Sequence, residues 1–186
     1  MLETKRFKIN APVLSDLDNW YQLQANPEVM RYVGGPRNRA TIIKWLEQDI
    51  SHYAAHGFCV GSVFSKKNEQ FIGRSGMVYL NYDSDQSDIE IGYMLHVEQW
   101  GKGFAQELVN ALIDWGFSEL GFDKLMAITN PDNKRSQHVL KKAGMQWVKC
   151  IRYHNESSDA FEIYSNREET LINKVEYPHC QFGQDM

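Results

Sequence analysis

The chain of 186 residues, 42% hydrophobic and 24% charged, has the length and composition of one globular domain, which excludes a disordered protein. Its net charge of −4 is spread over interspersed acidic and basic residues, so we expect no nucleic-acid partner. The sequence shows no apolar signal region and no run of ~18 apolar residues, so we expect a cytoplasmic protein without a membrane span. It contains no CxxC pair, so we expect neither a disulfide scaffold nor a zinc knuckle.

The first half of the chain predicts two helices and a run of strands. Helical spacing of apolar residues places the first helix after Ser15, which could cap it, and the second at about 41–56, where Gly57 would end it. Strands are predicted at 7–9, 58–64, 71–80 and 89–97, and the second and third of these would form an antiparallel hairpin.

In the second half, helices and strands alternate. A long helix begins near Phe104 and ends at Gly121, and a shorter helix at about 134–143 is closed by Gly144. Strands are predicted at 124–129, 145–153 and 161–164. This order predicts an α+β fold with a mixed, mostly antiparallel central sheet flanked by helices, in a single domain over 1–170 with a C-terminal extension at 171–186.

The glycine-rich loop before the long helix is the strongest local motif. Gly101 and Gly103 would let the backbone approach an anion, and the free N–H groups of the helix's first turn favour a phosphate there. A plain strand-to-helix turn is the alternative for an isolated pair of glycines. Two known phosphate loops do not fit, because the dinucleotide fingerprint needs Gly or Ala where Gln106 stands, and the P-loop needs four residues between its glycines.

Two segments give this motif a family context. The first is Glu90-Ile91-Gly92-Tyr93-Met94-Leu95, followed by Glu98-Gln99-Trp100-Gly101-Lys102-Gly103-Phe104-Ala105, and the second is Asn130-Pro131-Asp132-Asn133-Lys134-Arg135-Ser136. In these segments the chain resembles the GNAT family of N-acetyltransferases, in particular its RimJ/RimL-like branch of ribosomal-protein N-terminal acetyltransferases. The resemblance covers nearly the whole chain and fades after Glu169.

The resemblance implies acetyl-CoA as cosubstrate, without a metal. Its pyrophosphate would bind the glycine loop, and its pantetheine would enter a gap between the strands at 89–97 and 124–129, which would run parallel but splay apart. The implied cofactor-binding residues are Met94, Leu95, Val97, Trp100, Gly101, Lys102, Gly103, Phe104, Ala105, Asn133 and Ser136. Glu98 stands where many members carry Gln or Arg, so backbone amides would make the phosphate contacts.

Acetyl transfer to an amine needs a base that removes a proton from the amine and a donor for the developing oxyanion. Strand alternation turns Glu90 away from Ile89 and Ile91, and in several family members a catalytic glutamate stands at this position. A glutamate that merely faces solvent is the alternative. The resemblance places Ser136 near the thioester sulfur as a proton donor, and Leu140 replaces the tyrosine that many members use as general acid.

The sequence therefore predicts an acetyl-CoA-dependent N-acetyltransferase that acts on a primary amine of a small molecule or a protein N-terminus, as a monomer or homodimer. Arg31, Tyr32 and the acidic loop 83–88 would border the acceptor cleft.

Two alternatives stay open: a non-catalytic acetyl-CoA-binding regulatory protein, and a nucleotide-binding domain. His52 and His56 lie one helical turn apart, but without a third ligand they predict no zinc site.

Overall fold

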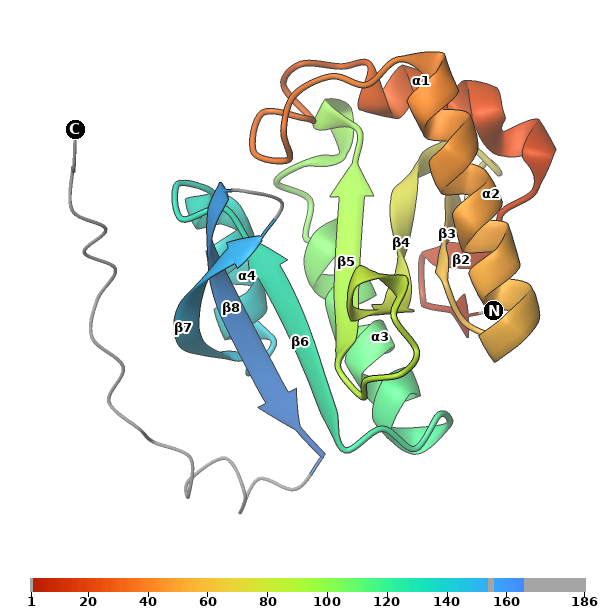
Figure 1. Ribbon diagram of the computed structural model, residues 1–186. Helices are drawn as coiled ribbons and strands as arrows, with labels where there is room; N and C mark the ends of the chain where they lie inside the picture. The colour runs from red at the N-terminus through yellow and green to blue at the C-terminus, as the bar shows by residue number, and fades with distance from the viewer. Residues whose placement is uncertain (1, 154–155, 166–186) are drawn as a thin grey trace.

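The computed structural model describes residues 2–153 and 156–165, which form an eight-stranded sheet with helices on both faces (Figure 1). The strands are β1 (Leu2–Glu3), β2 (Phe7–Asn10), β3 (Val60–Ser65), β4 (Phe71–Tyr79), β5 (Ile89–Leu95), β6 (Lys124–Thr129), β7 (Gln146–Tyr153) and β8 (Glu156–Tyr164). The helices are α1 (Leu17–Gln24), α2 (Arg39–His56), α3 (Phe104–Ser118) and α4 (Lys134–Lys142), with short 3-10 helices η1 (Leu14–Asp16), η2 (Leu80–Tyr82) and η3 (Val97–Gln99).

The strand order across the sheet is β1-β2-β3-β4-β5-β6-β8-β7, and all neighbours are antiparallel except β5 and β6. The parallel pair is joined at one position only, Glu90 opposite Met126, whereas β4 pairs along the whole of β5. Beyond Glu90 the two strands diverge toward their carboxyl ends, as Figure 1 shows. The predicted α+β fold and its splayed parallel pair are confirmed.

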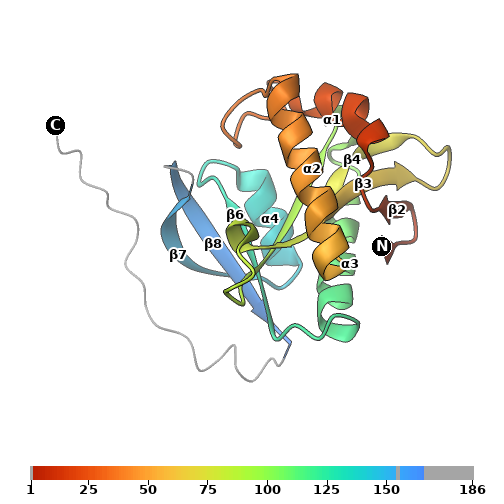
Figure 2. The ribbon, with the colours of Figure 1, turned by 45° about the vertical axis from the view of Figure 1, so that its right-hand side comes forward.

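Each face of the sheet carries its own pair of helices (Figures 1 and 2). Helix α3 packs on β4, β5 and β6, and α4 packs on β6 and β7, over the main apolar core that includes Leu108, Leu112 and Phe161. On the opposite face, α1 packs on α2 and β4 around a second apolar cluster that includes Trp20 and Leu46. The gap between β5 and β6 therefore lies between a face covered by α3 and α4 and a face covered by α1 and α2.

The amino-terminal half differs from the prediction at three points. Ser15 does not cap a helix, because it lies inside η1, where the Asp16 carboxylate accepts the N–H of Val13. Helix α2 begins at Arg39, earlier than predicted, because the side chain of Asn38 accepts the N–H of Thr41. The additional strand β1 pairs with β2.

Gly57 ends α2 in the left-handed conformation (φ 78°), as predicted. Several strand boundaries differ from the prediction: β3 begins at Val60 and not at 58, and the differences at β5 and β8 affect the site or are larger. Strand β5 ends at Leu95, so Val97 lies in η3 and not on the strand. Strand β8 begins at Glu156, five residues ahead of the predicted Phe161, because its polar first half gains hydrogen-bonded neighbours in both β6 and β7. The predicted extension at 171–186 lies outside the described residues.

Within the part of the chain that the structure describes, no helix combines the length and apolarity needed to cross a membrane.

Candidate active site

The glycine loop connects η3 to α3. Gly101 and Gly103 have φ values of 72° and 71°, a left-handed conformation that favours glycine. Gly103 is the N-cap of α3, and among the described residues no side chain caps this 15-residue helix. The first-turn N–H groups of α3, which begin at Phe104 and Ala105, therefore stand at the positive end of the helix dipole without a side-chain acceptor. Such an arrangement favours an anion.

Trp100 fixes the start of this loop. Its indole Nε1–H donates to the carbonyl oxygen of Leu95 at 2.9 Å, which joins the loop to the end of β5. The guanidinium of Arg135, on α4, lies 5.3 Å from the centre of the Trp100 ring. Lys102 is exposed, and its Nζ lies 3.4 Å from the side-chain oxygen of Gln99. The loop is thus attached to β5 and α4, on the two sides of the splay.

Backbone groups at the end of β5 face the splay at alternate positions. The N–H of His96 donates to the carbonyl of Ile72 at 3.0 Å, so the hydrogen-bonded positions of the β4–β5 ladder are His96, Met94 and every second residue before them. Met94 therefore directs its N–H and C=O toward β4. The intervening residues Tyr93 and Leu95 direct theirs toward β6, so the backbone groups of these two residues, and not those of Met94, face the gap.

Glu90 lies at the one position where β5 and β6 meet, and it is partly buried. It faces the same side of the sheet as Met94, whose side chain packs against the cluster under α1 and α2. Its Oε2 accepts the Tyr153 hydroxyl proton at 2.9 Å. Burial raises the pKa of Glu90 to about 7, and the hydrogen bond from Tyr153 acts in the opposite direction. A carboxyl group with this pKa can accept a proton at neutral pH.

Ser136 lies in the first turn of α4, across the splay from β5. The hydroxyl of Tyr93 donates to Ser136 Oγ at 3.2 Å, which leaves the Ser136 proton able to point into the gap. Asn133 caps α4 by accepting the N–H of Ser136 at 3.1 Å through its side-chain oxygen. Leu140, one turn later, is 2% exposed and belongs to the main core. Ser136 and Tyr93 are therefore the hydroxyl groups at this side of the gap.

The two candidate proton-transfer groups lie on opposite sides of the sheet. Glu90 faces the side of α1 and α2, whereas Tyr93 faces the side of α3 and α4 and reaches Ser136 there. A thioester that enters through the splay from the glycine loop would meet Ser136, and an amine that approaches from the other side would meet Glu90. This geometry suits a transfer reaction that takes place within the gap.

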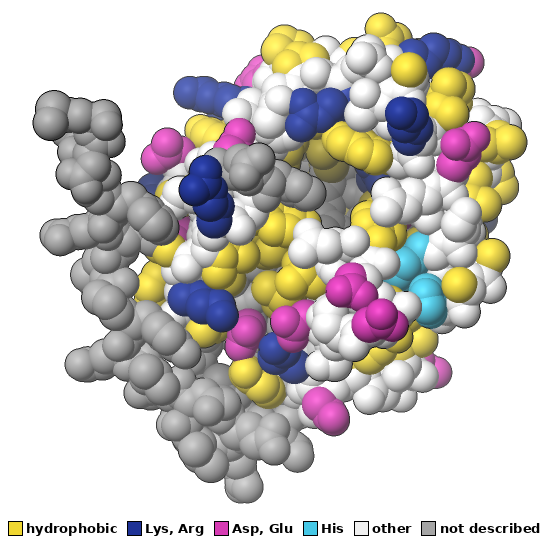
Figure 3. Space-filling view, viewed as in Figure 1, with side chains coloured by type: hydrophobic (Ala, Val, Ile, Leu, Met, Phe, Trp, Pro, Cys, Tyr) yellow, Lys and Arg dark blue, Asp and Glu magenta, His cyan; other side chains and the backbone are white. Residues whose placement is uncertain are grey.

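A cavity of about 650 Å³ opens near the carboxyl end of β6. Its lining residues come from the α1–α2 connection, the β6–α4 loop and the start of β8, and they are Arg31, Gly34, Gly35, Asn130, Pro131, Asp132, Glu156 and Ser157. Glu156 pairs with Tyr153, the hydrogen-bond partner of Glu90, which connects the cavity wall to that carboxylate. Figure 3 shows the surface hollowed between these loops. Arg31 lines the cavity, whereas Tyr32 and the loop 83–88 do not belong to its lining.

The described residues contain no group of three His, Cys, Asp or Glu that could hold a metal ion. Both ring nitrogens of His52 have backbone partners: Nδ1 lies 2.7 Å from the Phe58 carbonyl, and Nε2 accepts the N–H of Tyr79 at 3.3 Å.

Comparison with known proteins agrees with this geometry. Residues 6–146 match the acetyltransferase (GNAT) domain family. The chain belongs to this family. It is 32% identical over 162 residues to the uncharacterized protein YkkB of Bacillus subtilis, covering 87% of this chain and 94% of that protein. It is 30% identical to the uncharacterized N-acetyltransferase p20 of Bacillus licheniformis, over 88% of this chain and 92% of that protein.

Among solved structures, the GNAT fold recurs in the spermidine N-acetyltransferase of Vibrio cholerae, crystallised with CoA and spermine. The two chains superpose with a TM-score of 0.70 at 18% sequence identity, over 86% of this chain and 95% of that one. The enzyme class predicted from the sequence, an N-acetyltransferase, is confirmed by the family and by the relatives.

Two tyrosines at the candidate site of this GNAT enzyme escaped the sequence prediction. Tyr93 belongs to the motif Glu90–Leu95, and strand alternation could have singled out its backbone as one that faces the gap. Tyr153 carries no such signal, because it meets Glu90 across 63 positions of sequence.

Proposed function

We propose that this GNAT enzyme moves an acetyl group from acetyl-CoA directly to a primary amine, in a complex that holds both substrates, as in the RimJ/RimL-like branch. The observation that carries the proposal is that the candidate proton-transfer groups lie on opposite sides of the gap between β5 and β6. A base with a raised pKa lies on one side, and a hydroxyl donor with an anion-binding loop lies on the other.

The glycine loop fits the pyrophosphate of acetyl-CoA, and the gap between β5 and β6 fits its pantetheine arm. The uncapped N–H groups at the start of α3 would bind the pyrophosphate. The backbone groups of Tyr93 and the N–H of Leu95 face the diverging strand and would hold pantetheine, since ladder groups need hydrogen-bond partners, whereas the Leu95 carbonyl already accepts the Trp100 indole N–H. Asn133 uses its side-chain oxygen for the helix cap, so its amide nitrogen is the group available to pantetheine.

The reaction assigned to the gap has three parts. Glu90 removes a proton from the ammonium form of the acceptor, directly or through a water molecule. The N–H of Leu95, directed into the splay, stabilises the negative charge that develops on the thioester oxygen. The neutral amine attacks the thioester carbon, so that a C–N bond forms and the C–S bond breaks. Ser136 gives its proton to the departing sulfur and recovers one from the nitrogen of the new amide, directly or through water, and Tyr93 supports it by donating to Ser136 Oγ.

Direct transfer agrees with the position of Cys59. This thiol is fully buried, and burial raises its pKa, so a reactive thiolate does not form there. For the acceptor, the cavity wall carries two carboxylates, Asp132 and Glu156, against one cation, Arg31, and this negative balance favours a cationic amine. The spermine bound to the Vibrio cholerae enzyme is an amine of this class.

Release of free thiol from acetyl-CoA in the presence of a panel of amines, including spermidine, an aminoglycoside and short peptides, tests the proposal. We expect thiol release that depends on at least one cationic amine. CoA at 100 times its Kd should stabilise the fold by about 2.7 kcal/mol. Stabilisation by NAD or ATP but not by CoA would instead identify a nucleotide-binding domain.

The rival function, an acetyl-CoA-binding regulator without turnover, rests on Leu140, which replaces the tyrosine expected as general acid. It predicts stabilisation by CoA without thiol release for every amine in the panel.

A further inference from the structure

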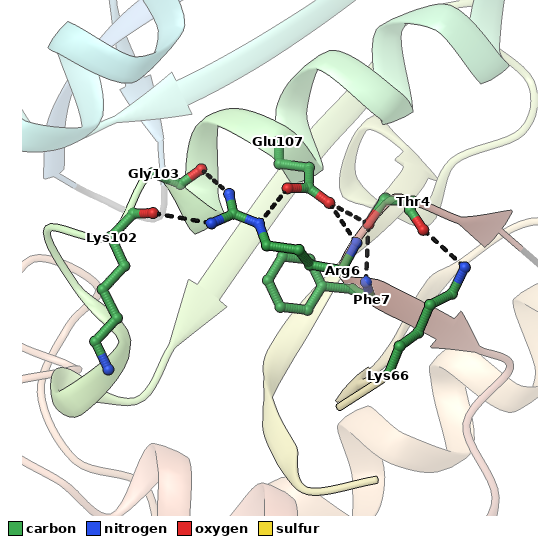
Figure 4. Close-up of polar contacts among 7 residues, drawn as sticks. All are labelled: Thr4, Arg6, Phe7, Lys66, Lys102, Gly103 and Glu107. Carbon is green, nitrogen blue, oxygen red and sulfur yellow. Dashed lines mark hydrogen bonds and ion pairs between the residues drawn. The ribbon is translucent and has the colours of Figure 1, made fainter. Parts of the chain in front are cut away.

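The turn between β1 and β2 lies against the glycine loop, and Figure 4 shows how its side chains reach that loop. Arg6 extends from this turn and donates to two loop carbonyls: Nη1 to Lys102 O at 3.2 Å and Nη2 to Gly103 O at 3.1 Å. Its guanidinium also lies 4.5 Å from the centre of the Phe104 ring. One side chain near the amino terminus therefore contacts three consecutive residues at the start of α3.

Glu107, in the first turn of α3, holds Arg6 in this position. Its Oε2 accepts Arg6 Nε at 2.5 Å, and its Oε1 accepts the backbone N–H of Arg6 at 2.8 Å and the hydroxyl of Thr4 at 2.6 Å. Burial acts to raise the pKa of Glu107, but these hydrogen bonds and the Arg6 charge outweigh it and lower that pKa. Lys66 anchors the turn from the other side by donating to Thr4 O at 2.7 Å.

The contact fixes the direction of two peptide groups. In a trans peptide the C=O and the following N–H point in opposite directions. When Arg6 holds the carbonyls of Lys102 and Gly103, the N–H groups of Gly103 and Phe104 are directed away from Arg6. The carbonyl of Gly103 also accepts the backbone N–H of Glu107 at 3.2 Å, so α3 and Arg6 hold that peptide group together, whereas the carbonyl of Lys102 precedes the helix and accepts from Arg6. Because glycine tolerates many backbone conformations, the contact at Lys102 matters most for the orientation of the Gly103 N–H.

The ion pair also removes an unfavourable charge. The Glu107 carboxylate lies within the first turn of α3, where it would repel an incoming pyrophosphate. The Arg6 guanidinium at 2.5 Å compensates this charge while its remaining nitrogens contact the loop.

We propose that Arg6, held by Glu107, is a positioning residue that presents the N–H groups of Gly103 and Phe104 to the pyrophosphate of the cosubstrate. Arg6 touches the loop and not the reacting atoms. The inference rests on the proposed function, since it assumes that the anion on the loop is the pyrophosphate of CoA.

The test compares two probes by NMR titration of the ¹⁵N-labelled chain: CoA, and pantetheine, which lacks the pyrophosphate. For Arg6→Ala we expect about tenfold weaker CoA binding, equivalent to about 1.4 kcal/mol, with the Kd of pantetheine unchanged. Amide exchange at Gly103 and Phe104 should become faster in the unliganded variant. Arg6→Lys, which keeps the charge but loses the fork of donors, and Glu107→Gln should each give part of the loss.

Arg39→Ala is the matched control, because Arg39 also pairs with a carboxylate, Asp18 at 2.6 Å, and lies over an aromatic ring, but on α2. Its CoA affinity should stay within about twofold of the unaltered chain. Equal losses for CoA and pantetheine in Arg6→Ala, or unchanged CoA affinity, would refute the role of Arg6. If Arg6→Ala does not fold, the same comparison is read from Arg6→Lys. An unaltered chain that does not bind CoA would refute the proposed function itself.

Discussion

Glu90 is a carboxyl group whose surroundings favour its neutral form up to about neutral pH. Burial raises its pKa to about 7, so its carboxylate forms as the pH rises through that value. We therefore expect kcat/KM to increase with pH and level off above about 7. Glu90→Gln should remove this rise and lower kcat/KM at pH 8 by about 10²-fold or more, the usual contribution of a general base.

The matched control is Glu119→Gln, since Glu119 is exposed at the end of α3. It should keep both the rate and its pH dependence. Affinity for CoA, measured separately, should be the same in both variants, because Glu90 faces the amine side of the gap. A pH profile that survives Glu90→Gln would remove Glu90 from the mechanism.

Tyr153 adjusts the pKa of this base. Its hydroxyl donates to Glu90 Oε2 at 2.9 Å, and this hydrogen bond lowers the pKa of Glu90 against the effect of burial. Tyr153→Phe removes the donor and keeps the ring, so the pKa of Glu90 should rise and the kinetic profile should move to higher pH. The rate above the shifted pKa should be largely retained. A shift to lower pH would contradict the geometry.

Ser136 is assigned to the leaving thiol and not to the amine. Ser136→Ala should lower kcat by about tenfold or more with little change in the Kd of CoA, because it removes a proton donor and not a phosphate contact. Tyr93→Phe, which removes only the partner of Ser136, should have a smaller effect of the same kind. Single-turnover measurements with acetyl-CoA separate this chemical step from binding. A Ser136→Ala variant with normal kcat would show that the thiolate leaves without help.

At the scale of elements, a buried ion pair joins α2 to β4. Asp49 Oδ2 lies 2.7 Å from Arg74 Nη2, and the side chains are 0% and 10% exposed. Gln24 Oε1 accepts from Arg74 Nη1, and the Tyr82 hydroxyl donates to Asp49 Oδ1. The Arg74 guanidinium lies 3.5 Å from the centre of the Trp20 ring. These contacts connect α1, α2 and η2 to the strand next to β5.

Removing one partner of this pair should be costly because it leaves the other charge buried without compensation. We expect Asp49→Asn to lower the free energy of unfolding by about 3–5 kcal/mol in urea titrations. The double variant Asp49→Leu/Arg74→Met should recover much of the loss, since an apolar pair needs no compensation. Asp18→Asn, which breaks an exposed pair with Arg39, should cost less than about 1 kcal/mol. Equal losses for Asp49→Asn and Asp18→Asn would contradict this account.

At the scale of the whole molecule, the carboxylate of Glu90, the proposed base, should reduce stability. The pKa of Glu90 is raised from an ordinary 4.5 to about 7 in the folded chain, so the unfolded chain ionises first as the pH rises. The contribution of Glu90 to the free energy of unfolding is therefore fully present below about pH 4.5, where the group is neutral in both states, and it is lost as the pH rises from 4.5 to 7.

Glu90→Gln does not titrate, so its free energy of unfolding should exceed that of the unaltered chain by an amount that grows from pH 4.5 to 7. At pH 8 the difference should be on the order of 3 kcal/mol, since one pKa unit corresponds to about 1.4 kcal/mol. Urea titrations at pH 5 and pH 8 measure it. A difference that is equal at both pH values would show that Glu90 has an ordinary pKa.

Apart from the short strand β1, the sequence by itself determined the order of the helices and strands, the α+β fold and the position of the glycine loop. These are local features: helical and strand periodicities and a pair of glycines before a helix are all read within a few consecutive residues. It placed Glu90 on the correct side of β5 for the same reason. It misplaced boundaries where a local hydrogen bond or a strand neighbour was decisive, as at Asn38 and at the start of β8.

Only the tertiary structure decided which side chains meet. Tyr153 reaches Glu90 across 63 positions, Tyr93 reaches Ser136 across 43, and Arg6 reaches Gly103 across 97. Each of these contacts depends on how strands and helices that are distant in the sequence pack together, which no local pattern of residues encodes. The sequence therefore located the loop that would bind the cosubstrate, and the packing of distant elements around the splay decided which groups orient that loop and which could move protons.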